Sequence, residues 1–102
     1  MDSITALDEL VRETVRSYST YGYNMAGQYI KLYFVENPLE QVFAILGPYD
    51  PAEGKAELVM MARIVNDQII IDFDKSSKSL ASALIRAGIP EAQIVVAGRK
   101  AS

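Results

Sequence analysis

The sequence predicts a small α+β fold made of an N-terminal helix, a four-stranded and largely antiparallel meander, a second helix and a fifth strand. Two segments have the three- and four-residue spacing of amphipathic helices, and short aliphatic segments separated by turn residues lie mainly between them. Strands joined by short turns pair antiparallel, which favours α+β over repeated βαβ units. The chain has 102 residues, so a single domain over residues 1–102 is expected.

The first helix is predicted over residues 3–18. Its charged side chains fall largely on one face, and Asp2 or Ser3 can cap the free backbone N–H groups at its start. The apolar positions of the other face are Ile4, Leu7, Leu10, Val11, Val15 and Tyr18. Burial of this apolar face is expected to hold the helix in place.

The four strands of the meander are predicted from aliphatic composition and from the turns between them. They cover residues 28–35, 41–46, 57–65 and 68–73. The first alternates, with Ile30, Leu32 and Phe34 on one face. The second is apolar on both faces, so it is expected to be central in the sheet or covered on both sides. Asn66-Asp67 suits a tight two-residue hairpin between the last two strands.

The second helix is predicted to begin after Ser76 or Ser77, whose side chains can cap its first turn. Gly88 follows the last apolar position, where a left-handed residue ends a helix, and Pro90 prevents continuation. Residues 93–97 then form the fifth strand.

The composition excludes several classes of chemistry. The chain contains no Cys and no His, which removes disulfides, thiolate nucleophiles, imidazole catalysis and the usual zinc sites. Ten basic and 13 acidic residues give a net charge of −3, which argues against unaided binding to nucleic acid. No cofactor is expected, because the common glycine-rich phosphate-binding motifs do not occur. No apolar run long enough to span a membrane is present, so a cytoplasmic location is expected.

Two acidic groupings could in principle support metal chemistry. Asp72 and Asp74 alternate on one strand, and carboxylates on one strand face could hold Mg²⁺ or Ca²⁺ in a small metal-dependent hydrolase. Asp50, Glu53 and Lys55 resemble a nuclease set, but they stand together in a loop rich in Pro and Gly that holds geometry poorly. A structural role is the simpler reading of both groupings, with Asp74 helping to cap the second helix.

Tyrosines are the most informative candidates for binding. Tyrosine combines a large contact area with a polar tip, which suits a surface that meets a protein partner. Such rings could instead cover the second face of the sheet, and stacking on nucleic-acid bases would require more interleaved Lys or Arg than the segment has. The residues assigned to partner binding are Tyr21, Tyr23, Tyr29 and Tyr33.

The last third of the chain also carries a family resemblance. Its elements in order are the strand Ile69-Ile70-Ile71, Asp74, a helix with Leu80, Ala81 and Leu84, the stop Gly88-Ile89-Pro90-Glu91, and the strand Ile94-Val95-Val96. In this order, residues 68–97 resemble the C-terminal half of the XisI family, the fdxN-element excision controlling factors found mainly in cyanobacteria. The sequence departs from the family pattern at Lys75-Ser76-Ser77, where members have Gly-Thr-Glu, and at Gly98-Arg99, where members have Phe-His and a longer tail.

The resemblance implies a non-enzymatic accessory protein in the control of DNA-element excision. It also implies a partner of the XisH type, a nuclease-like protein, bound through protein–protein contacts. Half of the residues are hydrophobic in a chain with limited interior, which favours a homodimer. The alternatives are a direct DNA-binding excision factor and the metal-dependent hydrolase that would use Asp72 and Asp74.

Overall fold

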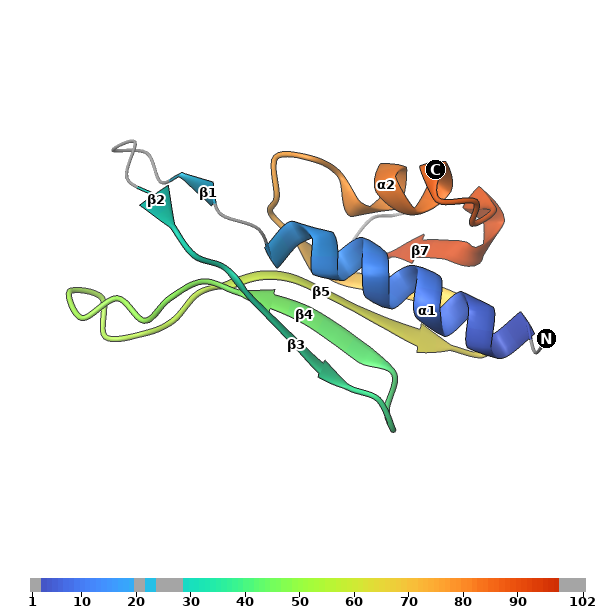
Figure 1. Cartoon of the computed structure of the whole chain (residues 1–102), viewed down its shortest axis with the longest axis horizontal. Coiled ribbons are helices and arrows are strands. Elements are labelled where there is room, and N and C mark those ends of the chain that lie inside the picture. The colour runs from blue at the N-terminus through green and yellow to red at the C-terminus, as the bar shows by residue number, and fades with distance from the viewer. Residues whose placement is uncertain (1–2, 20–21, 24–28, 98–102) are drawn as a thin grey trace.

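The computed structural model describes residues 3–19, 22–23 and 29–97. A five-stranded sheet carries two helices on one side, and a separate two-stranded hairpin projects beyond the end of the first helix (Figure 1). The elements in chain order are α1 (Ser3–Arg16), η1 (Ser17–Ser19), β1 (Gly22–Tyr23), β2 (Tyr29–Ile30), β3 (Tyr33–Asn37), β4 (Val42–Leu46), β5 (Leu58–Val65), β6 (Gln68–Asp74), α2 (Leu80–Arg86), η2 (Glu91–Gln93) and β7 (Ile94–Val96).

The main sheet has the strand order β3-β4-β5-β6-β7. Its first four strands pair antiparallel in sequence order, and β7 pairs parallel to β6 after the crossover through α2. The predicted α+β class is therefore confirmed, and so is the predicted order for the two helices and the main sheet, but the separate β1–β2 hairpin was not predicted. The single predicted strand over residues 28–35 is wrong, because the chain leaves β2 after Ile30 and resumes pairing in β3 at Tyr33.

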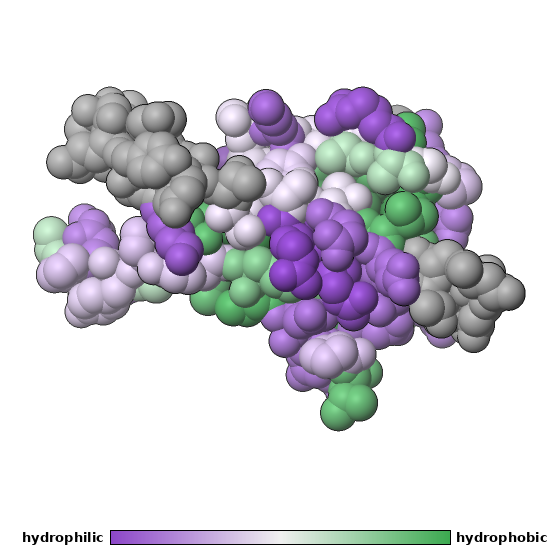
Figure 2. Space-filling view, viewed as in Figure 1, coloured by the Kyte–Doolittle hydropathy of each residue, from purple (hydrophilic) through white to green (hydrophobic). Residues whose placement is uncertain are grey.

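The core lies between the helices and one side of the sheet. In β4, Phe43 and Ile45 are fully buried beneath α1, which contributes Val11 and Val15. The outward surface of α1 is mainly hydrophilic (Figure 2), and Glu9, Glu13 and Arg16 are exposed there. The whole cluster of buried apolar residues is Val11, Val15, Phe43, Ile45, Met60, Ala62, Ile64, Ile69, Ile71, Leu80, Leu84 and Ile89. Burial of this cluster supplies the main driving force for the fold.

Two local signals that the sequence contained are confirmed. Asn66 and Asp67 have φ angles of 50° and 63°, the left-handed pair that a tight two-residue turn between β5 and β6 requires. Gly88 has a φ of 110°, and the N–H of Ile89 returns to the Leu84 carbonyl at 3.1 Å. Ile89 is thereby buried in the core. No helix in these described ranges is both long and apolar enough to cross a bilayer.

Candidate functional site

The candidate site is the side of the main sheet that faces away from the helices, which we call the open face. Along β5, Met60 and Ala62 are fully buried on the helix side, whereas Met61 and Arg63 alternate with them and are partly exposed. Residues directly opposite one another in neighbouring strands share a face, so the pairing register defines the whole surface. Its members are Tyr33, Val35, Asn37, Val42, Ala44, Leu46, Leu58, Met61, Arg63, Val65, Gln68, Ile70, Asp72, Phe73 and Val95.

The open face is apolar along continuous rows that cross the strands. One row runs Val35, Ala44, Met61, Phe73 from β3 to β6. At its two ends, Val35 and Phe73 are 42% and 41% exposed, values high for large apolar side chains. A contiguous apolar surface of this kind is typical of a site of contact with another macromolecule. The strand β4 was predicted to be central in the sheet or covered on both faces. It does lie inside the sheet, between β3 and β5, but α1 covers only one of its faces.

The charged members of the open face form an ion pair with each other. Arg63 Nε donates to Asp72 Oδ2 at 2.8 Å, and its Nη2 donates to Oδ1 at 3.2 Å. The hydrogen bond to Asp72 and the charge of that carboxylate raise the pKa of Arg63. This two-pronged geometry fixes both side chains against the sheet. The pair leaves the face electrically balanced.

The structure separates Asp72 from Asp74, so the prediction that they share a strand face is wrong. A bulge in β6 sets Phe73 opposite Met61 but Ile71 opposite Ala62, which leaves Asp72 as the extra residue. Because of this extra residue, Asp72 lies on the open face and Asp74 lies on the helix side, opposite the buried Met60. The two carboxylates therefore cannot hold one cation together as the hydrolase hypothesis requires.

Asp74 instead organises the start of α2. Its Oδ2 accepts the N–H of Leu80 at 2.8 Å, and its Oδ1 accepts the N–H of Ser76 at 2.9 Å. The predicted N-cap at Ser76 or Ser77 is wrong, because Ser79 occupies that position and accepts the N–H of Ser82 at 3.2 Å. The expected capping role of Asp74 is confirmed.

The loop with Asp50, Glu53 and Lys55 is held by its own backbone. Asp50 and Lys55 form an isolated bridge, and the Asp50 side chain accepts the N–H of Ala52 at 2.9 Å. All three candidate side chains of this loop are exposed. In the part of the chain that the structure describes, no three Asp or Glu residues come together as a metal site.

Of the four tyrosines assigned to partner binding, Tyr33 has a described side chain. Tyr21 lies outside the described residues, and the side chains of Tyr23 and Tyr29 also lie outside what is described, although their backbones pair in the β1–β2 hairpin. Tyr33 begins β3 on the open face, is 45% exposed, and has the Lys31 ammonium 5.4 Å from its ring centre. Tyr33 therefore lies on the open face, a short distance along the chain from the β1–β2 hairpin.

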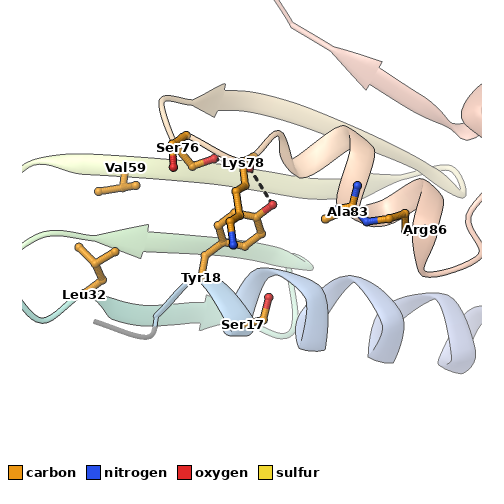
Figure 3. A pocket seen from close by; sticks show the side chains of 9 residues that line it. Ser17, Tyr18, Leu32, Val59, Ser76, Lys78, Ala83 and Arg86 are labelled. Atoms are coloured by element: carbon orange, nitrogen blue, oxygen red, sulfur yellow. Dashed lines mark hydrogen bonds between the residues drawn. The ribbon is translucent and has the colours of Figure 1, made fainter. Parts of the chain in front are cut away.

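A hollow of about 410 Å³ lies between the end of α1 and the loop before α2 (Figure 3). Tyr18 lines it, and the Tyr18 hydroxyl donates to the Lys78 carbonyl at 2.8 Å (Figure 3). The same proton is shared with the Ser79 carbonyl, 3.2 Å away. The hydroxyl of Ser76, also on the wall, donates to the same Lys78 carbonyl at 2.7 Å. The Tyr18 hydrogen bonds join η1 to the segment before α2, and the Ser76 hydrogen bond lies within that segment. We assign the hollow a structural role.

Comparison with known proteins decides the family. The XisI protein family model matches residues 1–102, the whole chain. The chain belongs to the XisI family. The resemblance of residues 68–97 to the XisI family is therefore confirmed and extends over the whole sequence.

Solved structures of XisI proteins have the same fold as this chain. The crystal structure of the fdxN element excision controlling factor XisI from Anabaena variabilis ATCC 29413 superimposes with a TM-score of 0.75 at 16% identity, covering 97% of this chain and 95% of that one. A XisI-like protein from the same organism gives a TM-score of 0.77 at 14% identity, covering 94% and 87%. No curated protein sequence matches the chain.

Sequence reasoning missed the open face as a site. The signal was present, since β4 is apolar at every position and β5 at all but Arg63. Which of these apolar positions would be covered depended on both helices packing on the same side of the sheet, and the periodicity of each strand does not contain that information.

Proposed function

We propose that this protein is a non-enzymatic accessory protein in the control of DNA-element excision and that it acts by binding another protein. Membership of the XisI family supports the role in excision control. The single observation that supports a protein-binding mode is Tyr33, an exposed aromatic side chain at the edge of the open face that follows the β1–β2 hairpin in sequence. The positive charge of Arg63 on the neighbouring open face is neutralised by Asp72, whereas binding to a polyanion requires uncompensated positive charge.

The partner proposed is a nuclease-like protein of the XisH type. Its contact region would be the tyrosine-rich segment formed by Tyr21, Tyr23 and Tyr29 together with Tyr33 at the rim of the open face. Tyr33 supports this placement because it is a large, exposed side chain next to the projecting β1–β2 hairpin. Exposed tyrosines at the centre of a contact are among the residues that most often dominate binding energy.

The proposal is tested by measuring binding to a purified XisH-type protein by calorimetry. Tyr33→Ala is expected to weaken the complex about tenfold or more, the usual effect of truncating an anchor residue. Tyr49→Ala is the matched control, because Tyr49 is 63% exposed in the β4–β5 loop, outside the proposed contact region. Equal loss from both substitutions would contradict the assignment of the tyrosine segment.

The same preparations distinguish the DNA-binding alternative. Fluorescence anisotropy with a labelled DNA duplex at low salt is expected to show no binding by this chain alone. Tight binding that weakens steeply with added salt would indicate that the protein contacts DNA directly, and it would overturn the proposed mode of action.

A further inference from the structure

We propose that the open face is covered by the open face of a second copy of this chain, in a two-fold symmetric dimer with the Arg63–Asp72 pairs close to the axis. This inference goes beyond the proposed function, because it concerns self-association through the centre of the sheet and not the XisH-type partner at the tyrosine-rich rim. Two observations carry it: the charge pattern of the face and its apolar rows.

The charge pattern fits a second copy. In a two-fold contact the same patch serves both subunits, so the patch must be complementary to itself. Arg63 and Asp72 stand side by side on neighbouring strands, with Nε and Oδ2 2.8 Å apart. A half-turn about an axis between them brings each Arg63 next to the Asp72 of the other copy. An isolated charge of either sign would instead meet its own like charge.

The apolar rows provide the contact around these charges. Val35 and Phe73 end one row, and Ile70 and Val95 stand opposite each other in the pairing of β6 with β7. Val95 is 39% exposed although it belongs to an aliphatic strand. Side chains from two sheets packed face to face interdigitate and form an apolar layer about 10 Å thick. The open face has the composition of one half of such a layer.

The first experiment measures the solution mass by sedimentation equilibrium at micromolar concentration. The wild-type chain is expected to have twice the mass of the 11.2 kDa monomer. A wild-type chain that stays monomeric overturns the inference, even if it binds the XisH-type protein, and in that case the proposed function still stands. Conversely, a dimer that fails to bind that protein overturns the proposed function alone.

Matched lysine substitutions locate the contact. Val35→Lys places a charge on the open face at a residue that is 42% exposed, and Ile85→Lys places the same charge on α2 at a residue that is 43% exposed. Val35→Lys is expected to weaken the dimer roughly 30-fold or more, because a charge must then be desolvated at the contact, and Ile85→Lys to leave it unchanged. Met61→Lys is a second probe in the central strand. Far-UV circular dichroism confirms that each variant is folded, and a dimer that survives both open-face substitutions overturns the inference.

A charge swap tests the position of the axis. Arg63→Asp is expected to weaken the dimer at least tenfold, since two acidic side chains from each copy then meet. The double variant Arg63→Asp with Asp72→Arg restores opposite charges within and between copies, and it is expected to recover the wild-type dissociation constant within about threefold. An Arg63→Asp variant that dimerises as tightly as wild type overturns the placement of this pair at the axis.

Discussion

Arg12 of α1 donates from Nε to Oε1 of Glu36 in β3 at 2.9 Å, and this hydrogen bond ties the helix to the edge strand of the sheet. The same guanidinium donates from Nη2 to Asp8 at 2.8 Å and lies over the ring of Phe43 at 5.6 Å from its centre. The hydrogen bonds to both carboxylates raise the pKa of Arg12, with the bond to Glu36 the largest cause. The Arg12 side chain therefore contacts the helix α1, the edge strand β3 and the buried ring of Phe43.

Removal of the charge at position 12 is expected to destabilise the protein more than removal of its partner on the strand. Arg12→Met keeps the apolar stem but leaves the partly buried Asp8 without its partner, which costs about 1–3 kcal/mol. Glu36→Gln retains a hydrogen-bond acceptor and is expected to cost less than about 1 kcal/mol. Urea denaturation of both variants checks this order, with Glu40→Gln, an exposed residue in the β3–β4 turn, as the control.

Loss of the Asp74 carboxylate is expected to loosen α2. Asp74→Ala removes the acceptor of the Leu80 and Ser76 backbone N–H groups, and a change of about 1–3 kcal/mol in the free energy of unfolding follows. Asp50→Ala removes a similar acceptor from an exposed loop and is expected to cost less than about 0.5 kcal/mol. Equal losses in the two variants, measured by thermal denaturation, would show that Asp74 contributes no more than a surface turn.

Tyr18 is expected to make the free energy of unfolding decrease at alkaline pH. Burial raises the pKa of its hydroxyl above the ordinary value of 10.0, and the charge of Asp74 acts in the same direction. The folded protein holds this proton more tightly than the unfolded chain does. The contribution of Tyr18 to the free energy of unfolding is therefore fully present below about pH 10, and it is lost as the pH rises from there through the folded-state pKa.

The comparison with Tyr18→Phe isolates this contribution. At neutral pH the variant is expected to be about 1 kcal/mol less stable, because it lacks the hydrogen bond to the Lys78 carbonyl. The difference from wild type is expected to shrink above pH 10, as only the wild type has this proton to lose. A gap that stays constant across unfolding experiments from neutral to alkaline pH would contradict the linkage.

The β5–β6 turn offers a stabilising substitution. Asp67 has a φ of 63°, where glycine has no steric cost, so Asp67→Gly is expected to stabilise the protein by about 0.5–1 kcal/mol. The hydrogen bond from Gln93 Nε2 goes to the Asp67 backbone carbonyl at 2.8 Å and is retained in the variant. Asp67→Ala is the control and is expected to lower the thermal unfolding midpoint, since alanine tolerates this conformation poorly.

Local signals predicted much of the fold because each depends on a short stretch of chain. The turn at Asn66-Asp67 and the helix stop at Gly88 are set by backbone conformations that few residues adopt, so single residues were enough to locate them. The N-cap residue of α2 was harder to predict from the sequence. Four serines precede or enter the helix, and in the structure Ser79 is the N-cap while Asp74, at the end of β6, accepts the Leu80 N–H.

The sequence by itself determined the class of fold, the order of the two helices and the main-sheet strands, and the family, because periodicity and turn chemistry are local and the XisI family model spans the chain. Only the tertiary structure decided which apolar residues are core and which form the open face. It also decided that Asp72 and Asp74 lie on opposite sides of the sheet. The physical reason is that one extra residue in a strand reverses the direction of every side chain after it, and that reversal depends on pairing with another strand.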